Sequence, residues 1–534
     1  MNSTPNPPTP PSPLPRRKLP LGIQTFAKLR EEGCYYVDKT AHAMRLIDSG
    51  SYYFLSRPRR FGKSLFLDTL KEMFEGNQAL FAGLAAATQW DWSKKYPVIR
   101  ISFGSGVLRN REELDQSIRE TMRLNRQTLG LQLPAGLPET NLPGNFAELI
   151  AQAHQHSGQR AVVLIDEYDK PILDCIEHSA AALDMRDGLK NLYSVLKGSD
   201  EHLKFVFLTG VSKFGKVSLF SGLNNLTDIT LEQAYSDICG YTETDVDTVF
   251  APELPGLDRA LIRQWYNGYN WLGESVYNPF GLLQLFRTRA IRPHWFETGT
   301  PSFLIKLLQQ RQQFTPDLTR IVASEALLST FDVDNIPVEA LMFQAGYLTI
   351  ASHRQVLGRL QLTLKYPNLE VQASLNDSLL QSLTGGQNVP ERQISRLFDL
   401  LLAQDFAGLK DLFHAFYASI ANDWYRKNEM SSFEGYYVSI FYSYFAALGL
   451  DIRLEDPTSF GRIDMTVLFN GQVFLFEFKV VELEPKGHAL QQIKAQGYAD
   501  KYKARGEPIH LIGVEFSKAS RNIVGFEFES LQIK

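Results

Sequence analysis

Two short runs of uninterrupted apolar residues constrain the fold of this chain more than any other feature of the sequence. Residues 161–165 read AVVLI and residues 205–209 read FVFLT. A strand that is apolar on both faces is typical of a parallel sheet with helices on both sides. Two more β-rich stretches and two helical stretches surround these runs, at residues 51–56, 97–103, 111–128 and 144–156. The alternation predicts an open, mostly parallel α/β sheet with helices over residues 21–250.

The first β-rich stretch leads into a loop whose residues suit phosphate binding. Gly62, Lys63 and Ser64 match the closing half of a P-loop. In such a loop the glycine lets the backbone approach a phosphate, the lysine reaches the β- and γ-phosphates, and the serine hydroxyl ligates Mg²⁺. The N-terminus of the helix that follows adds a favourable dipole. The sequence therefore predicts an ATP site of the P-loop NTPase type.

The loop departs from the standard pattern at its start. That pattern has a second glycine five positions before Gly62, where this chain has Arg57. The arginines of the loop, Arg57, Arg59 and Arg60, are interpreted either as extra phosphate clamps or as a basic surface. We expect Arg60 and Phe61 to belong to the nucleotide site.

Two acids follow the first apolar run. Asp166 is predicted to hold Mg²⁺ through water, and Glu167 to polarise the attacking water. Ending a buried strand with two carboxylates costs free energy unless something compensates for the charge. The alternative interpretation is a strand that emerges into solvent at this point. Thr209, at the end of the second apolar run, is predicted to sense the γ-phosphate.

Beyond the predicted sheet the pattern changes twice. Residues 251–380 have a helical pattern that is rich in aromatics, notably at 265–271 (WYNGYNW) and 277–280 (YNPF). We interpret them as a helical lid or connecting region in which the aromatics pack. From residue 385 helical stretches lead into a hairpin and a further helix, which predicts a second α/β domain over 385–534.

The hairpin of the second domain has a defined register. Asn470-Gly471 is the strongest short signal for a two-residue type I′ turn. Counting back from that turn places Asp464 opposite Glu477, on the same face of the sheet. Two opposed carboxylates repel each other, and a divalent cation between them removes the repulsion. A β-bulge would break this register.

Strand periodicity adds a lysine to this pair. Glu477 and Lys479 share one face, while the phenylalanines beside them take the other face, toward a core. A lysine beside two carboxylates can stabilise a pentacovalent phosphate or orient the attacking water. A metal held by Asp464 and Glu477 lowers the pKa of that water. The arrangement predicts a phosphodiesterase site that uses Mg²⁺, with Mn²⁺ as a substitute.

Two flanking helices provide further candidates. Glu434 begins a helical pattern that places it on the buried face, where it is either a further site carboxylate or an N-terminal capping acid. Residues 488–502 read as a helix on which Gln492 faces the site. Lys494, Lys501 and Lys503, on this helix or just after it, either meet a phosphate backbone or form a solvated face.

Charge and cysteine content narrow the classes of function. The chain has 55 lysines and arginines and 59 aspartates and glutamates, a net charge of −4, so any nucleic-acid contact must come from a local patch. Its three cysteines form no CxxC pair, which argues against a disulfide framework or a cysteine zinc site. Residues 1–20 contain eight prolines and are expected to form a disordered tail. Without a membrane-spanning run or a signal peptide, we expect a cytoplasmic protein that does not contact membranes.

Taken in order, these motifs resemble those of the bacterial and archaeal AAA-ATPase-like family with a C-terminal PD-(D/E)XK nuclease-like domain. The motifs that carry the resemblance lie at residues 36–40 (YVDKT), 57–65 (RPRRFGKSL), 164–168 (LIDEY), 208–211 (LTGV), 265–269 (WYNGY), 277–280 (YNPF), 297–301 (ETGTP), 343–350 (FQAGYLTI), 366–370 (YPNLE), 461–464 (GRID) and 476–479 (FEFK). The family's loop also looks like RPRRFGK. The resemblance implies ATP and Mg²⁺ residues at Lys63, Ser64, Asp166 and Glu167, and a nuclease signature at Glu434, Asp464, Glu477, Lys479 and Gln492.

The resemblance implies an ATP-gated nuclease acting on DNA or RNA, and of the two we expect DNA. A homo-oligomer, in which an arginine of a neighbouring subunit completes the ATP site, and a role in phage defence or mobile-element control fit this architecture. Two alternatives stay open. One is a nucleotide-switched module that binds nucleic acid or protein without cutting, and the other is a translocase driven by ATP.

Overall fold

A computed structural model describes residues 15–132, 138–213, 225–296, 321–329, 336–383, 391–419 and 434–532, together with residues 304, 305, 307, 308 and 318. The chain divides into two compact units. The first comprises Met1–Thr298 and Val322–Asn368, and the second Gly299–Ile321 and Leu369–Lys534. Each unit is treated by itself.

The first unit contains a five-stranded parallel sheet within the described residues. Its strands are β1 (Tyr52–Ser56), β2 (Val98–Ser102), β3 (Ala161–Asp166), β4 (Leu203–Gly210) and the short β5 (Thr227–Asp228). Their spatial order is β2-β3-β4-β1-β5, and every neighbouring pair is parallel. All side chains of β1 and β3 are buried, as the apolar run in β3 predicts. The prediction of an open parallel α/β sheet is confirmed.

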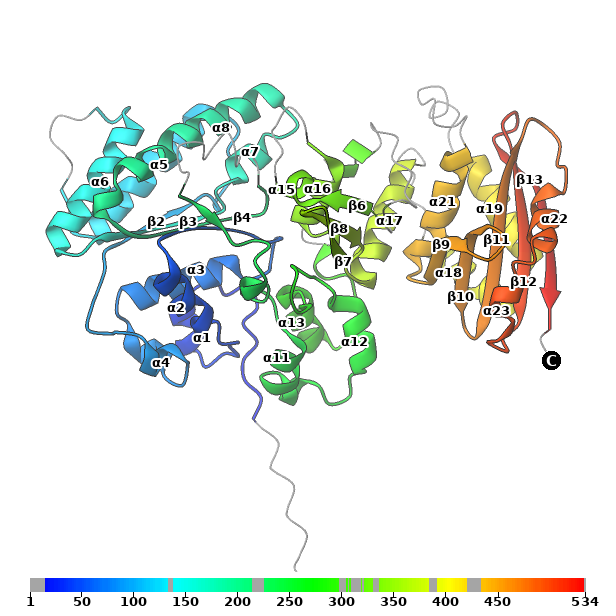
Figure 1. Cartoon of the computed structure of the whole chain (residues 1–534), viewed down its shortest axis with the longest axis horizontal. Helices are drawn as coiled ribbons and strands as arrows, with labels where there is room; N and C mark the ends of the chain where they lie inside the picture. The colour runs from blue at the N-terminus through cyan, green and yellow to red at the C-terminus, as the bar shows by residue number, and fades with distance from the viewer. Residues whose placement is uncertain are drawn as a thin grey trace, which may run out of the picture. The chain divides into compact units, whose positions relative to one another are not determined.

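Helices cover both faces of this sheet (Figure 1). One face carries α1 (Phe26–Glu31), α2 (Thr40–Ser49), α3 (Lys63–Phe74) and α4 (Ala86–Gln89). The other carries α5 (Arg111–Thr128), α6 (Leu142–Ser157) and α8 (Ser179–Tyr193). Short α7 (Lys170–Asp174), α9 (Val195–Gly198) and the 3-10 turns Gln78–Phe81, Asp200–His202, Gln233–Tyr235 and Ala251–Glu253 complete the connections.

The end of the proline-rich segment is part of the first unit. Residues 1–14 lie outside the described residues, but Lys18 forms a parallel β-bridge with Cys34, and Pro20 is buried. Leu19 packs against an apolar cluster of the same unit. The prediction of a disordered tail is therefore wrong for residues 15–20, because apolar contacts there offset the entropy of ordering.

The middle of the chain begins with helices and continues with both strands and helices. Its first part forms α11 (Glu243–Thr248), α12 (Arg259–Tyr266) and α13 (Pro279–Thr288). A three-stranded sheet of order β6-β8-β7 follows, from β6 (Ile321–Ser324), β7 (Thr349–Val356) and β8 (Arg359–Lys365), with α15 (Glu325–Ser329) and α16 (Val338–Ala345) between β6 and β7. The expectation of a helical region missed these strands. Their signal is the alternation in residues 359–365 (RLQLTLK), which has the strand period of two.

A glycine joins two of the aromatic motifs in this region. Gly268 has a φ of 109°, and a Cβ atom at this position would lie 2.0 Å from the carbonyl oxygen of Pro367. Asn368 then donates a hydrogen bond to the carbonyl of Asn267, over 3.0 Å. The WYNGY and YPNLE motifs are thus held together by a close backbone approach and by a hydrogen bond from the Asn368 side-chain amide, which agrees with the packing role that the sequence favours.

The second unit is a mixed sheet with helices on both faces. Its strands are β9 (Asp451–Pro457), β10 (Arg462–Phe469), β11 (Gln472–Val481), β12 (Ile509–Ser517) and β13 (Asn522–Leu531), in the order β13-β12-β11-β10-β9. Only β11 and β12 pair in parallel among these neighbours. Helices α17 (Leu369–Leu383), α18 (Glu391–Ala403), α19 (Phe406–Ser419) and α21 (Glu434–Ala447) contribute to a core on one face. Helices α22 (His488–Ala495) and α23 (Asp500–Lys503) cover the other face.

This arrangement bears on two expectations from the sequence. The phenylalanines Phe474, Phe476 and Phe478 all lie in the core with α21, as strand periodicity predicts. Helix α17, which the sequence analysis assigned to the middle region, belongs to the second unit and contributes Leu380 to the same core.

We expect Gly268→Ala to lower the free energy of unfolding of the first unit by about 3 kcal/mol or more, because it adds a backbone clash to the strain of a positive φ. Gly256 is the matched control, since its φ is 80° but nothing lies within 4 Å of its Cβ position. Gly256→Ala should cost only about 1 kcal/mol. Denaturant titration followed by tryptophan fluorescence measures both, and equal losses would contradict the close approach to Pro367.

Candidate functional site

The candidate phosphate loop links β1 to α3, as the sequence predicts. Gly62 directly precedes α3, and its φ of 96° places it in the left-handed region. A Cβ atom there would meet nothing within 4 Å, so the backbone conformation rather than crowding requires the glycine. Lys63 and Ser64 form the first turn of α3, where backbone N–H groups have no partner within the helix.

Arg57 stands where the standard loop has its first glycine, and its side chain is buried. Its guanidinium donates hydrogen bonds of 2.9–3.0 Å to the carbonyls of Ser56, Thr230 and Tyr235 and lies 4.1 Å from the centre of the Trp271 ring. Burial lowers the pKa of Arg57 to about 10. Neither interpretation from the sequence, a phosphate clamp or a basic surface, fits this position, because the charge is enclosed by backbone carbonyls.

Later in the loop, two arginines lie on the surface and one phenylalanine lies in the core. Arg59 and Arg60 are exposed, and the Arg60 guanidinium lies 4.8 Å from the centre of the Phe280 ring. Phe61 is buried, and its ring packs edge-on against Tyr269 with the two centroids 4.7 Å apart. The Phe61 ring therefore faces the core, which leaves only its backbone for the nucleotide contact expected from the sequence.

Lys63 is buried and faces the acids at the end of β3. Its Nζ donates hydrogen bonds to the carbonyls of Arg57 and Pro58, over 2.8 and 3.0 Å. Burial lowers the pKa of Lys63, while the charges of Asp166 and Asp169 act in the opposite direction. The expected lysine and the expected acid are thus brought to one place by the fold.

The two predicted acids have different environments. Asp166 is buried and accepts a hydrogen bond of 2.7 Å from the hydroxyl of Thr209. Thr209 is itself fully buried, so its hydroxyl orients Asp166 in this structure. Glu167 is half-buried with a φ of 54°, and burial, followed by the charge of Asp166, raises its pKa. A raised pKa suits a carboxylate that accepts a proton.

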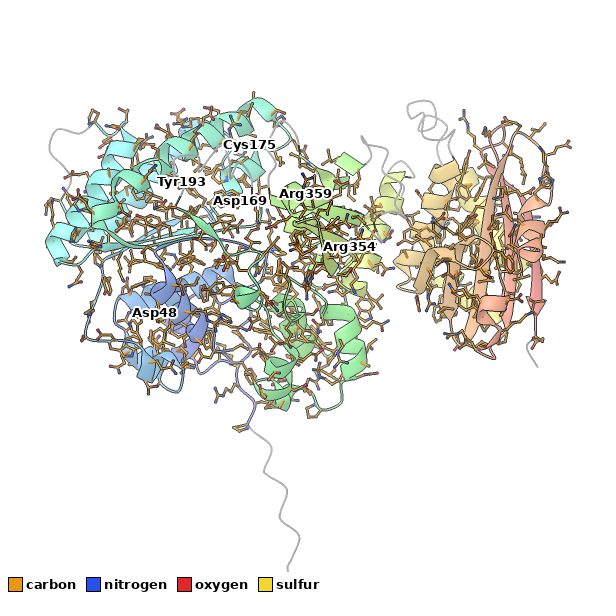
Figure 2. All side chains as sticks on the ribbon, viewed as in Figure 1. Asp48, Asp169, Cys175, Tyr193, Arg354 and Arg359 are labelled. Atoms are coloured by element: carbon orange, nitrogen blue, oxygen red, sulfur yellow. The ribbon has the colours of Figure 1, made fainter. Side chains whose placement is uncertain are left out.

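A third acid, Asp169, was missed by the sequence analysis (Figure 2). It is fully buried, and it accepts hydrogen bonds from the backbone N–H groups of Val211 and Ser212 and from the Ser212 hydroxyl. It thereby ties the end of β3 to the end of β4. Its only signal in the sequence is its place three residues after Asp166, which does not distinguish it from a surface acid.

A cavity of about 520 Å³ opens beside these residues. Its polar lining residues include Arg59, Arg60, Gly62, Lys63, Ser64, Glu167, Asp169 and Lys170. Its apolar lining residues include Leu21, Ile23, Val107, Tyr241, Phe280 and Leu283. A lining that mixes charged and apolar side chains suits a ligand that has both a charged and an aromatic part.

In the second unit, the hairpin has the predicted register. Asn470 and Gly471 have φ values of 49° and 69°, as a type I′ turn requires. The ladder runs from Phe469–Gln472 to Met465–Phe476 without a bulge. Asp464 follows one residue further along, and its carboxylate accepts a hydrogen bond of 2.8 Å from the backbone N–H of Phe478.

Glu477 is the centre of the second candidate site. Its Oε1 accepts hydrogen bonds from Lys479 Nζ, over 3.0 Å, and from the side-chain amide of Gln492. Its Oε2 is buried, and no described residue donates a hydrogen bond to it. Burial, and then the charge of Asp464, raises the pKa of Glu477 to about 7. The structure thus brings Asp464, Glu477, Lys479 and Gln492 together.

Helix α22 carries Gln492 and is fixed by two residues of β12 that the sequence analysis missed. The Glu515 carboxylate is buried and accepts hydrogen bonds from the backbone N–H groups of Lys486, Gly487 and His488, at the start of α22. Gly513 lets the helix approach the strand, because a Cβ atom there would lie 2.3 Å from the backbone nitrogen of Leu490.

The remaining predicted residues complete this account. Glu434 begins α21, but its side chain lies outside the described residues, as do residues 297–301 of the ETGTP motif. Lys494 pairs with Glu529, and Lys501 pairs with Asp456. Because both lysines have acidic partners, their positions favour the solvated face over contact with a phosphate backbone, the two alternatives that the sequence left open.

The donor set at Glu477 fits a divalent cation. An unpartnered buried carboxylate oxygen beside a second carboxylate is a costly arrangement that a cation would stabilise. Within the described ranges, no group of three or more His, Cys, Asp or Glu side chains could hold a metal. Mg²⁺ commonly binds through one or two carboxylates and takes its other ligands from water and substrate phosphates. Asp464 and Glu477 are the side chains that could hold it here, and Ser64 and Asp166 those in the first unit.

Comparison with known proteins identifies the same two parts. Residues 20–220 match a family described as predicted AAA-ATPase, and residues 432–526 match the PD-(D/E)XK nuclease superfamily. A protein of Azotobacter chroococcum mcd 1, described as an uncharacterized protein in the vnfD 5' region, is 62% identical over 517 residues. The aligned part spans 97% of this chain and 99% of that relative. The chain belongs to the predicted AAA-ATPase family and carries a PD-(D/E)XK nuclease-superfamily domain.

In this AAA-ATPase-like chain the matches coincide with the two candidate sites. The AAA-ATPase match includes the phosphate loop and the acids that end β3. The PD-(D/E)XK match runs from before α21 into β13 and includes the hairpin, Glu477 and α22. Among the helices described, none is both long and apolar enough to cross a bilayer.

We expect Glu515→Gln to lower the free energy of unfolding of the PD-(D/E)XK unit by about 2 kcal/mol at pH 7, because backbone donors at the start of α22 lose a charged acceptor. Burial raises the pKa of Glu515, but the hydrogen bonds from Lys486, His488 and Gly487 outweigh it and hold the pKa below its ordinary value. The stabilisation is therefore present above the ordinary pKa of glutamate and is lost as the pH falls through the folded-state pKa.

Denaturant titrations at pH 7 and at progressively lower pH measure this difference. Glu527→Gln is the control, because Glu527 is an exposed acid on the neighbouring strand β13. A cost that stays the same at low pH, or an equal cost in the control, would show that Glu515 does not hold the helix through its charge.

Proposed function

We propose that this chain is an ATP-controlled, metal-dependent nuclease that hydrolyses phosphodiester bonds in DNA. The observation that carries the proposal is the environment of Glu477, a buried carboxylate with one unpartnered oxygen, beside Asp464 and in contact with Lys479 and Gln492. A structural carboxylate would have both oxygens satisfied. This one fits a site that is completed by a cation.

In the nuclease half each side chain has a role that its position supports. Asp464 and Glu477 would hold the metal, which supplies Lewis acidity and a water of lowered pKa when bound. Lys479 places a positive charge beside the carboxylates, where it can bond a phosphate oxygen as negative charge develops. Gln492 donates to Glu477 and keeps that carboxylate in one orientation.

In the ATPase half the proposed ligand is ATP with Mg²⁺. The phosphates would lie at the phosphate loop, with Lys63 bonding them and Ser64 and Asp166 holding the metal. Glu167 would accept a proton from the attacking water, a role that its raised pKa suits. Two of the apolar lining residues, Tyr241 and Phe280, would contact the base. An arginine from a neighbouring copy in a homo-oligomer would complete the site.

Contacts around the phosphate loop support control by the nucleotide. Trp295 donates a hydrogen bond of 2.9 Å to the carbonyl of Arg59, and Gly346 packs against Pro58, which a Cβ atom would approach to 2.8 Å. Gln344 accepts a hydrogen bond of 2.8 Å from the backbone N–H of Lys213, just beyond β4. The middle region therefore contacts both the loop and the end of β4, where a change of nucleotide would act.

The setting that we propose is the cytoplasm, in phage defence or the control of mobile elements. Its support is the combination of a nucleotide-binding half with a nuclease half. The main alternative is a nucleotide-switched module that binds nucleic acid or protein without cutting it. For that module, replacing Lys479 beside Glu477 would only weaken binding, whereas for a nuclease it would abolish cutting.

We expect Lys479→Ala and Glu477→Gln each to lower the rate of DNA cleavage at least about a hundredfold, because each removes a group that contacts the reacting phosphate or its metal. The assay uses plasmid, linear duplex and single-stranded DNA, and RNA, with Mg²⁺ or Mn²⁺, with and without ATP. The control Lys494→Ala removes an exposed lysine from α22 and should leave the rate unchanged.

Binding measurements on the same variants separate the two candidate functions. If the wild-type chain binds DNA but cuts no substrate with any metal or nucleotide, the switched-binding function replaces the nuclease. If Lys479→Ala cuts as fast as wild type, the proposed site is wrong.

We expect Lys63→Ala to weaken ATP binding by about ten- to a hundredfold, the loss of a charge-assisted hydrogen bond to phosphate. Cleavage by this variant should no longer respond to ATP. Lys71→Ala, on the solvent side of the same helix, is the control and should bind ATP like the wild type. Equilibrium titration with a fluorescent ATP analogue measures the affinity. Unchanged binding in Lys63→Ala would exclude the phosphate role.

A further inference from the structure

The hairpin of β7 and β8 extends from the first unit as an exposed surface. We call residues 349–365 the basic hairpin. From residue 351 to 359 every side chain is exposed, and Leu357 at the tip is 100% exposed. The base of the hairpin is anchored, because Leu362 and Leu364 are fully buried. A two-stranded hairpin with an exposed tip therefore extends from a packed base.

The basic hairpin has an unusual charge for this chain. It contains Arg354, Arg359 and Lys365 and no aspartate or glutamate, although acids outnumber basic residues in the whole sequence. In the described ranges, no ion pair involves Arg354 or Arg359, in contrast to Lys494 and Lys501 of the nuclease half. The basic hairpin is therefore a candidate for the local positive patch that nucleic-acid contact would require in a chain with a net charge of −4.

Strand register places the two arginines on one face. Arg354 pairs with Gln361, and Val356 pairs with Arg359, so Arg354 and Arg359 are diagonal neighbours on the same side. The Arg354 Nε donates a hydrogen bond of 2.6 Å to Gln361 Oε1, which orients the guanidinium and leaves its outer N–H groups free for phosphates. The buried residues Leu362 and Leu364 alternate with Arg359 and Gln361 along β8, so they lie on the other face of the hairpin.

The tip residue is strained as well as exposed. Leu357 and Gly358 have φ values of 49° and 80°, the pattern of a two-residue type I′ turn. Asparagine, aspartate or glycine is favoured at the first of these positions, and a leucine there is disfavoured. A leucine at a strained position costs stability, which favours a role outside folding.

We propose that the basic hairpin docks into the minor groove of duplex DNA, with Arg354 and Arg359 on the phosphates and Leu357 inserted between base pairs. Proteins that bind this groove combine arginines with an apolar wedge, and the narrow B-form minor groove brings the phosphates of its two strands close together. The minor groove of duplex RNA is wide and shallow, so its phosphates lie further apart. The inference rests on the proposed function in taking DNA as the partner, but it needs no cleavage.

Binding is measured with the full chain in EDTA, which prevents metal-dependent cutting, by fluorescence anisotropy of a fluorescein-labelled duplex of about 30 base pairs, spanning roughly three turns of DNA. The variant Arg354→Ala/Arg359→Ala should bind at least about tenfold more weakly, and the slope of log affinity against log salt should become shallower by about two. Leu357→Gly, which relieves the strained φ, should weaken binding severalfold without changing the slope.

The control Arg119→Ala/Arg123→Ala removes the same charge from α5, and it should keep the wild-type affinity and slope. Thermal melting verifies that all variants are folded. Equal losses in the control, or an unchanged slope in Arg354→Ala/Arg359→Ala, overturn the proposal, as does an equal loss on duplex RNA of the same sequence. Cleavage by wild type with Mg²⁺ is scored separately, so a failed hairpin and a failed nuclease give different results.

Discussion

The free-energy cost of burying a charge is the constraint on which both halves of this chain depend. Around the phosphate loop three charged side chains are buried, and each has backbone partners. The Arg57 guanidinium donates to carbonyls, Lys63 donates to the carbonyls of its own loop, and Asp169 accepts from the backbone just beyond β4. At Glu477, one buried carboxylate oxygen has no donor among the described residues, and a second carboxylate, Asp464, lies beside it. Such a pair of acids points to a cation at that position.

In the phosphate loop, Arg57 replaces the first glycine of the standard pattern and fixes the start of the loop by hydrogen bonds. A standard loop uses its first glycine to turn the backbone tightly. Here Arg57 fastens the start of the loop to neighbouring carbonyls and stacks on Trp271, while Trp295 and Gly346 hold the following residues from outside. These contacts come from the middle of the chain, which gives a physical reason for the aromatic motifs there. They also make the loop sensitive to movement of that region.

The nuclease half relies on one helix and one hairpin that are fixed in different ways. The hairpin is set locally, because the left-handed conformations of Asn470 and Gly471 determine the register and hence the place of Asp464 and Glu477. Helix α22 is set by tertiary contacts, since Glu515 caps its start and Gly513 allows its close approach. Only when both are in place does Gln492 reach Glu477. A chain can therefore keep every signature residue and still lose the site if β12 changes.

The sequence by itself determined the features that follow from local periodicity and local turns. These include the buried parallel strands, the helix after Gly62, and the pairing in the hairpin, because each depends on residues close together in the chain. It did not determine whether a charged side chain is buried or exposed, so Arg57, Asp169 and Glu515 were misread or missed. Nor did it show that the hydroxyl of Thr209 is bonded to Asp166. Only the tertiary structure decided these points, because the burial and partners of a side chain depend on segments far away in sequence.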